Sequence, residues 1–271
     1  MTRARDLARY NDFSGTELIL DADGDTSITA DTDDQIDIKV GGSDTVHMGL
    51  TTYNASDRIV LTNTSGNASM AIVAGTSGES SIFMADGTSG DASYRGYLQY
   101  QHANDNWNFG TAATLAMKID SAGHVTKPLQ PSVHVQRAST QANIPVATDQ
   151  TVEFNSELFD VNSDFNTGTY TFTAPVTGKY LVSTNVRMES VPTDFQYYYL
   201  YLVTSNGNRW GDLMGQGSQY FSSAPLYVTM GFTCVADMDA NDTAFIRIYQ
   251  GGGTAQMDID SNSNFCIQLL S

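Results

Sequence analysis

The chain has 271 residues, a formal net charge of −17 and only 13 Lys and Arg, so binding to a phosphate backbone such as nucleic acid is not expected. Its 41% apolar and 10% aromatic residues are enough for a core, and abundant Thr, Ser, Asp, Gly and Tyr predict an almost entirely β protein. Because no apolar run reaches the length of a membrane span, membrane insertion is not expected either.

Residues 1–13, MTRARDLARYNDF, form a basic peptide on an acidic chain. The peptide lacks the apolar stretch and the cleavage site of a signal peptide. A frayed terminus is one interpretation, and a peptide that docks on an acidic partner is the other. For the second interpretation the candidate anchor residues are Arg3, Arg5, Leu7 and Arg9.

Residues 14–50 alternate between apolar and polar side chains, as in QIDIKV, where Ile36, Ile38 and Val40 share one face. This alternation predicts β-strands. The run DADGD at residues 21–25 suggests a calcium loop, but its sixth position is Thr26 and its twelfth is Thr32, so it fails the EF-hand pattern. Solvated turns are expected there, and no cofactor is predicted, with a calcium ion left open.

Three consecutive twelve-residue segments begin with Thr-Ser-Gly at Thr64, Thr76 and Thr88. A period this short fits one strand and one turn, not a pair of helices. One such unit cannot bury its own apolar face, so copies must stack or several chains must wrap together.

The alternation continues to residue 127, with turns expected at Asn104-Asp105 and Ala122-Gly123. Two prolines at 128 and 131 then interrupt the pattern and predict a domain boundary. The expected organisation is therefore a peptide at 1–13, a β-rich repetitive shaft at 14–127, a proline linker at 128–132 and a knob at 133–271.

The knob has longer and more aromatic strands. The stretch QYYYLYLV is apolar on both faces, which predicts burial on both sides, one of them against another subunit. Its residues expected in the core or a trimer interface are Tyr197, Tyr198, Tyr199, Leu200 and Tyr201. The only two cysteines, Cys234 and Cys266, are expected to be free thiols.

The segment FDVNSDFNTGTYTFTAPVTGKYLVS resembles the globular head of complement component 1q and its tumour-necrosis-factor-like relatives. The matching core consists of Phe172, Thr173, Ala174, Pro175, Val176, Gly178 and Tyr180, and the closing NFCIQLL is similar to the last strand of that family. The strand after Ala224 departs from the family, and no collagen tract precedes the head. The resemblance implies a ten-stranded jelly roll that assembles as a homotrimer.

The segments LILDADGDTSITADTDDQIDIKVGG and MKIDSAGHVTKPLQP resemble parts of tailed-bacteriophage fibre proteins. That resemblance implies an N-terminal peptide docked on another virion protein, a trimeric shaft and a distal knob. The expected fold class is all-β, with a trimeric β-rich fibre shaft followed by a jelly-roll β-sandwich knob. The expected location is the virion, after assembly in the host cytoplasm.

The function expected from both resemblances is a homotrimeric tail fibre whose knob binds a glycan or protein receptor on a bacterial surface. One alternative is a capsid or collar decoration fibre without obligatory receptor binding, and another is a polysaccharide-degrading tail spike. Cleavage of a glycoside needs two carboxylates across a groove, yet Asp237, Asp239 and Asp242 lie in turn-like stretches. The four histidines are scattered without metal or triad spacing, so an enzyme is not expected.

Counting alternating strands, with the last strand antiparallel to the first, places three loops at the end of the knob away from its entry. These loops are Glu189–Asp194, Gly215–Ala224 and Gly251–Asn262, with Phe195 at the edge of the first. Aromatic rings can stack on sugars, and carboxylates and amides can bind hydroxyls or a bridging calcium ion. The candidate receptor-binding residues are Glu189, Asp194, Tyr220, Phe221, Gln256, Asp258 and Asp260.

Overall fold

The computed structural model describes residues 18–20, 22, 27–29, 35–40, 43–49, 66–207 and 209–271. The chain forms two compact units, residues 1–73 and 74–271. In the first unit the predicted strands form an antiparallel four-stranded sheet in chain order, made of β1 (Leu18–Ile19), β2 (Ser27–Thr29), β3 (Gln35–Val40) and β4 (Ser43–Gly49). The candidate anchor residues Arg3, Arg5, Leu7 and Arg9, and the aspartates at 21, 23 and 25, lie outside the described residues.

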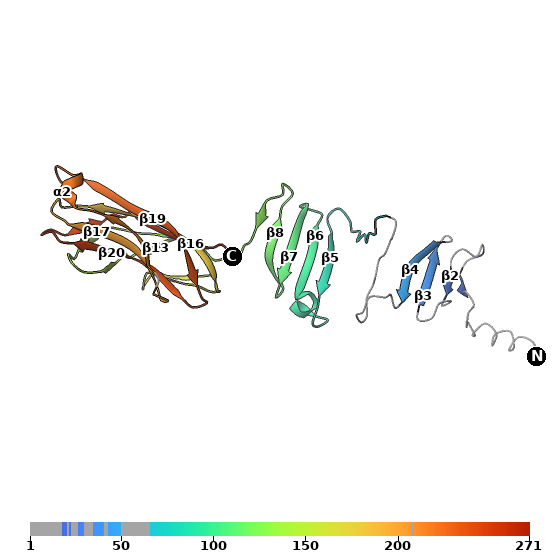
Figure 1. Ribbon diagram of the computed structural model, residues 1–271. Coiled ribbons are helices and arrows are strands. Elements are labelled where there is room, and N and C mark those ends of the chain that lie inside the picture. Colours follow the sequence, from blue (N-terminus) through green and yellow to red (C-terminus); the bar gives the residue numbers. More distant parts are fainter. Residues whose placement is uncertain are drawn as a thin grey trace, which may run out of the picture. The chain divides into compact units, whose positions relative to one another are not determined.

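The second unit begins with an antiparallel five-stranded sheet, also in chain order (Figure 1). Its strands are β5 (Glu79–Met84), β6 (Gly96–Gln101), β7 (Asn106–Thr111), β8 (Thr114–Ile119) and β9 (Val125–Thr126). Both predicted turns are confirmed: Asp105 has a positive φ of 48° between β6 and β7, and Gly123 has a φ of 86° between β8 and β9. The left-handed backbone at Gly123 is the reason that a glycine suits this position.

The five-stranded sheet has one mainly apolar face and one mainly polar face, which also carries Phe83 and Tyr97. Cross-strand pairing aligns Ile82, Leu98, Phe109 and Met117 in one row of the apolar face, and Tyr100, Trp107, Ile119 and Val125 in the next. On the other face the pairs align Ser81, Gln99, Asn108 and Lys118. The apolar face is open, since Ile82, Trp107 and Val125 are 38%, 41% and 56% exposed.

The three Thr-Ser-Gly segments do not share a structure, so the prediction of one strand and one turn per repeat is wrong. The described part of the first segment, residues 66–75, contains no strand, whereas the second contains β5. The third contains a 3₁₀ helix, η1 (Gly90–Tyr94), before β6 begins. Local bonds account for the helix: the Ser93 hydroxyl donates to the Gly90 carbonyl, and the Tyr94 hydroxyl donates to the Asp91 carboxylate.

From Ser132 onward the chain forms a sandwich of two antiparallel sheets. One sheet has the order β11-β21-β16-β22-β10-β13, with β19 also paired to β16, and the other has the order β14-β15-β20-β17-β18, with β12 also paired to β20. The bounds in the first are β10 (Ser132–Gln136), β11 (Gln141–Ile144), β13 (Ser156–Val161), β16 (Gly178–Glu189), β19 (Tyr227–Met238), β21 (Met257–Ile259) and β22 (Asn264–Leu269). Those in the second are β12 (Gln150–Thr151), β14 (Phe165–Asn166), β15 (Thr171–Thr173), β17 (Tyr197–Thr204), β18 (Arg209–Met214) and β20 (Thr243–Gly251).

The four longest strands, β16, β17, β19 and β20, alternate between the two sheets along the chain, as in a jelly roll. The predicted all-β class with a jelly-roll sandwich is therefore confirmed. The implied count of ten strands differs from the seven-stranded and six-stranded sheets observed, since short segments such as β12 and β14 add to the main strands. A four-residue helix, α2 (Gly217–Tyr220), follows β18. Among the described residues, no helix has the length and apolar character that crossing a membrane requires.

The core lies between the two sheets and follows the period of two along each strand. In β16 the inward residues Tyr180, Val182, Val186 and Met188 are all 0% exposed, because side chains alternate between the two faces of a strand. The Tyr180 hydroxyl donates to the Val176 carbonyl at 2.7 Å, which fixes the turn before β16.

Cys234 and Cys266 are free and lie on opposite faces of the same sheet. Cys234 packs against the core, and burial raises the pKa of its thiol to about 11. Cys266 pairs with His134 and Ser183 on the outer face. The opposite orientations explain why the two thiols form no disulfide.

The proline segment before the sandwich is tied to it by hydrogen bonds. The Gln130 side chain donates to the Leu269 carbonyl at 2.7 Å, and the Leu269 amide donates to the Pro131 carbonyl at 3.0 Å. The entry of the chain into the sandwich therefore lies beside its last strand.

Candidate functional site: three loops at one end of the sandwich

The strand pairing places the three candidate loops at the same end of the sandwich. Ser132 pairs with Gln268, so the first strand starts where the last strand finishes. At the other end of β16, Glu189 pairs with both Asp258 and Tyr227. In the second sheet Tyr197 pairs with Gly251, and Tyr198 pairs with Met214. All three loops thus start or finish beside these pairs, opposite the entry of the chain.

The first loop is held to the third by Asp194. Its carboxylate accepts hydrogen bonds from the Thr254 hydroxyl at 2.7 Å and from the Thr254 amide at 2.8 Å. The hydroxyl bond, followed by the amide bond, lowers the pKa of the Asp194 carboxyl. The prediction that this loop exposes an aromatic ring is wrong, because Phe195 is 0% exposed and packs on Tyr198.

The second loop carries α2 and presents one exposed ring. Gly217 sits directly on Phe195, where a Cβ atom would lie 2.5 Å from the ring, so only glycine fits. Tyr220 at the end of α2 is 61% exposed, whereas Phe221 is partly buried against the core. Of the two predicted aromatic residues, only Tyr220 therefore presents its ring to solvent.

The third loop is shaped by a buried amide. Gln250 is 0% exposed, and its side chain donates to the Ala255 carbonyl at 2.8 Å. Gly252 and Gly253 both have positive φ angles, 69° and 94°, which lets the chain reverse above this amide. Gln256 is exposed, and the half-buried Asp258 accepts a hydrogen bond of 2.6 Å from the Asn143 amide.

The structure corrects the prediction that Asp260 is a receptor-binding residue. It is 7% exposed, and its carboxylate accepts hydrogen bonds from the Arg187 guanidinium at 2.7 Å and from the Asn262 amide at 2.8 Å. Burial alone would raise the pKa of Asp260, but the bonds from Asn262 and Arg187 outweigh it, and the pKa is lowered. A paired and buried carboxylate holds the loop and is not available to a ligand.

We expect the Asp260→Asn protein to be less stable than the wild type at pH 7 by about 2 kcal/mol, since hydrogen bonds to a charged group are lost. Because the folded pKa of Asp260 lies below its unfolded value, near 3.9, its contribution is present above that pH and is lost as the pH falls through the folded pKa. Denaturant unfolding at pH 7 and pH 3 measures the free energy of unfolding of both proteins. The difference in stability between them should be smaller at pH 3 than at pH 7, and an equal difference at both pH values would contradict this role of Asp260.

Of the remaining predicted residues, Glu189 accepts a hydrogen bond of 2.9 Å from the Thr140 hydroxyl. Sequence analysis missed two exposed apolar residues at this end, Leu226 at 76% and Tyr227 at 45% exposure. The Arg187 guanidinium lies 4.5 Å from the centre of the Tyr227 ring. In the sequence, the apolar pair Leu226-Tyr227 directly after Pro225 could have indicated this exposed surface. The end of the sandwich therefore offers Tyr220, Gln256, Leu226 and Tyr227 to a partner.

The predicted two-faced strand is β17. Tyr198 and Leu200 are 0% exposed and lie in the core, as expected. On the outer face Tyr201 is also buried, by contacts within its own chain, and its hydroxyl donates to the Asp149 carboxylate at 2.5 Å. Tyr197 and Tyr199 on that face are half-buried. Only these two of the five residues are thus open to a second subunit.

The three aspartates considered for catalysis hold the turn between β19 and β20. Asp242 accepts hydrogen bonds from the Ser205 hydroxyl and the Asp239 amide, and Asp237 lies 3.6 Å from the Lys179 ammonium group. Within the described ranges, no group of three or more His, Cys, Asp or Glu side chains is arranged to hold a metal ion.

No protein-family model and no curated protein matches the chain. Solved structures that resemble it include the globular domain of zebrafish complement 1qA protein, with 19% identity, a TM-score of 0.39 and coverage of 52% of this chain and 98% of that one. Murine APRIL resembles it at 11% identity, with TM-scores of 0.38 for the crystal structure at pH 8.0 and 0.37 for that at pH 5.0, each covering 52% of this chain and 99% of the other.

Proposed function

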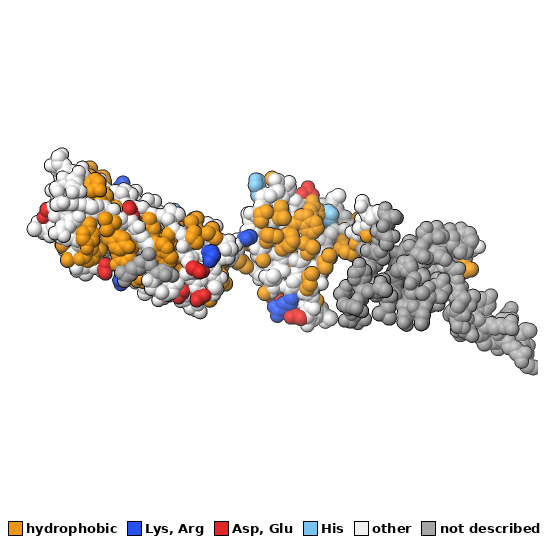
Figure 2. Space-filling view, in the orientation of Figure 1, with side chains coloured by type: hydrophobic (Ala, Val, Ile, Leu, Met, Phe, Trp, Pro, Cys, Tyr) orange, Lys and Arg blue, Asp and Glu red, His pale blue; other side chains and the backbone are white. Residues whose placement is uncertain are grey.

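We propose that the chain is the subunit of a homotrimeric bacteriophage fibre whose C-terminal sandwich binds a receptor on a bacterial surface. The observation that carries the proposal is the open apolar face of the β5–β9 sheet. The face of this sheet turned toward the viewer in Figure 2 carries a broad group of hydrophobic side chains. A sheet with one apolar face is stable in water when another layer covers that face.

The other face of the same sheet carries the apolar pair Phe83 and Tyr97 but is otherwise mostly polar, and its polar side chains bind one another. The Gln99 amide donates to the Glu79 carboxylate at 2.9 Å, and the Asn108 amide donates to the Gln99 carbonyl oxygen at 3.2 Å. The contrast between the two faces supports burial of the apolar face between copies of the chain. We expect three copies in the assembly because both halves of the sequence resemble proteins that form trimers.

A fibre subunit needs an attachment end and a binding end. The basic peptide with Arg3, Arg5, Leu7 and Arg9 is suited by its charge to dock on another virion protein. The binding end is the group of three loops, which combines an exposed ring at Tyr220 with the amide of Gln256. Three identical sites on one fibre would combine weak single contacts into a strong attachment.

A double variant, Tyr220→Ala with Gln256→Ala, tests the receptor-binding part. Purified wild-type protein is expected to compete with phage particles for adsorption to host cells. We expect the variant to compete about five- to thirtyfold less well, since it loses a ring contact and hydrogen bonds worth about 1–2 kcal/mol together.

The matched control is Val176→Ala, which removes an exposed side chain, 44% accessible, from the opposite end of the sandwich. It should compete like the wild type. Equal competition by the double variant would remove the three loops from receptor binding and would favour a decoration fibre without a receptor.

A further inference from the structure

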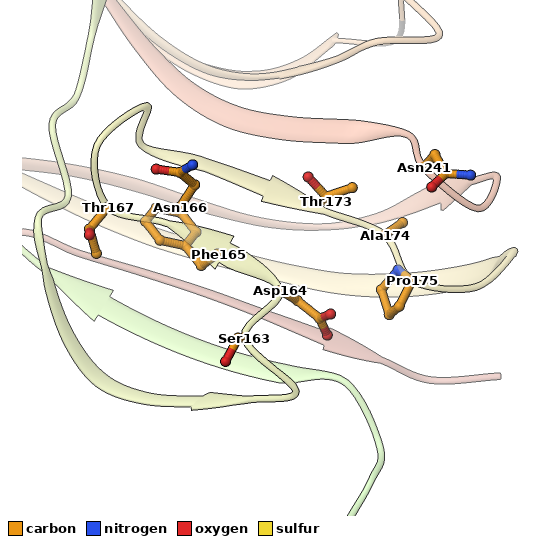
Figure 3. A pocket seen from close by; sticks show the side chains of 9 residues that line it. All are labelled: Ser163, Asp164, Phe165, Asn166, Thr167, Thr173, Ala174, Pro175 and Asn241. Atoms are coloured by element: carbon orange, nitrogen blue, oxygen red, sulfur yellow. The ribbon is translucent and has the colours of Figure 1, made fainter.

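An open cavity of about 540 Å³ lies at the end of the sandwich opposite the three loops. It is bordered by the turn between β13 and β14, by β15 and by the turn that carries Asn241 (Figure 3). The pairing of Thr173 with Thr243, the first residue of β20, places it at that end. Its volume is within the range of small-molecule sites in proteins.

The carboxylate-bearing residue Asp164 lines the cavity. The Oδ2 atom of Asp164 is buried and accepts no hydrogen bond in the described structure. Figure 3 shows this side chain between Ser163 and Pro175. Burial, followed by the nearby Asp160 carboxylate, raises the pKa of Asp164, while a hydrogen bond with the Asn162 side chain lowers it. The residue as a whole is half-buried and lines the cavity, so a ligand hydroxyl there can donate a hydrogen bond to the exposed part of this charged carboxylate.

Asp160 itself is not available to a ligand. Its two carboxylate oxygens accept hydrogen bonds from the backbone amides of Asp164 and Phe165, both at 2.9 Å. These bonds hold the turn that positions Asp164. A calcium ion prefers six to eight oxygen ligands, including several carboxylates, and only one carboxylate lines this cavity.

The other polar groups of the lining are neutral hydroxyls and amides. They belong to Ser163, Asn166, Thr167, Thr173 and Asn241, and no Lys or Arg is among the lining residues. Such groups both donate and accept hydrogen bonds. An anion would be repelled by Asp164 and would find no cation, whereas adjacent hydroxyls of a sugar could donate to the carboxylate and accept from the neutral groups.

The rim is held in an uncommon backbone conformation. Asn162, Ser163 and Asn241 have positive φ angles of 76°, 60° and 74°, and they lie on two separate turns that border the cavity. Each turn is fixed by a hydrogen bond: the Asn162 side chain donates to the Leu129 carbonyl, and the Asn241 backbone N–H donates to the Ala174 carbonyl at 2.7 Å. Left-handed non-glycine residues cost energy and often mark binding sites.

From this geometry we propose that the cavity binds a neutral sugar residue, with the Asp164 carboxylate as the acceptor for its hydroxyl groups. The site is separate from the three loops and does not depend on their role in receptor binding.

The test uses the full-length chain and saturation-transfer NMR with the methyl glycosides of glucose, galactose, mannose and N-acetylglucosamine. At least one of these four probes should bind the wild type. Titration calorimetry with the bound glycoside should then show at least about tenfold weaker binding for Asp164→Asn, since a hydrogen bond to a charged acceptor contributes about 1.5–3 kcal/mol. A second variant, Asn241→Gly, keeps the left-handed backbone and its N–H group but removes the side-chain amide, and it should also bind more weakly.

The matched control is Asp237→Asn, which removes an exposed carboxylate that does not line the cavity. It should bind like the wild type. The proposal would be overturned if none of the four glycosides binds, if Asp164→Asn binds as well as the wild type, or if the cavity takes up calcium chloride and none of the sugars. The Asp164→Asn protein should compete for phage adsorption like the wild type, which would show that this site and the three loops act separately.

Discussion

Replacing Trp107 by Asp is expected to raise the protein concentration at which the trimer dissociates by at least about a hundredfold. Trp107 is 41% exposed in the single chain and lies in the middle of the apolar face, between Tyr100 and Ile119. In the proposed trimer this face is covered, so each copy would bury a charge without a partner, which costs several kcal/mol. Light scattering over a dilution series measures the change.

The matched control for Trp107→Asp is Thr126→Asp. Thr126 is exposed on the polar face of the same sheet and pairs with Lys118, so the added charge stays in water beside a cation. This variant should dissociate like the wild type. If Trp107→Asp also dissociates like the wild type while its circular dichroism is unchanged, the apolar face is not an interface between copies.

Replacing Leu200 by Asp is expected to prevent folding of the sandwich. Leu200 is 0% exposed and lies in β17 between β18 and β20, where a carboxylate would have neither water nor a partner. The milder Leu200→Ala should fold and lose about 2–5 kcal/mol of stability, which denaturant unfolding measures. Soluble Leu200→Asp protein with a native near-ultraviolet spectrum would contradict the assignment of Leu200 to the core.

Tyr199→Asp is the matched variant on the other face of the same strand. Tyr199 is half-buried and stacks on Tyr201 with ring centres 4.6 Å apart. Because water reaches this face in the single chain, we expect the variant to fold. A Tyr199→Asp protein as insoluble as Leu200→Asp would show that the outer face of β17 is also needed for folding.

Local patterns in the sequence predicted the parts of the fold that depend on near neighbours. The apolar stretch QYYYLYLV identified the buried residues Tyr198 and Leu200 of β17, because side chains in a strand alternate with a period of two. The turn at Gly123 followed from residue chemistry alone. The repeat prediction failed because Ser93 and Asp91 form local bonds that favour a 3₁₀ helix over a strand.

The binding residues were harder to predict, since their roles depend on partners far away in the chain. Asp260 looked like a free loop carboxylate, but Arg187, 73 positions earlier, neutralises it. Phe195 looked exposed, but Gly217 leaves room for its ring to be buried. The position of Asp164 on a cavity wall has no signature in the sequence, because only the folded turns form that cavity.

The solution mass of the full-length chain, measured by multi-angle light scattering, tests the proposed homotrimer most directly. The proposal predicts a species of three times the 29.3 kDa subunit mass that persists on dilution. A stable, soluble species of 29.3 kDa at all concentrations would contradict it, because the apolar face of the β5–β9 sheet would then be open to water in the native protein.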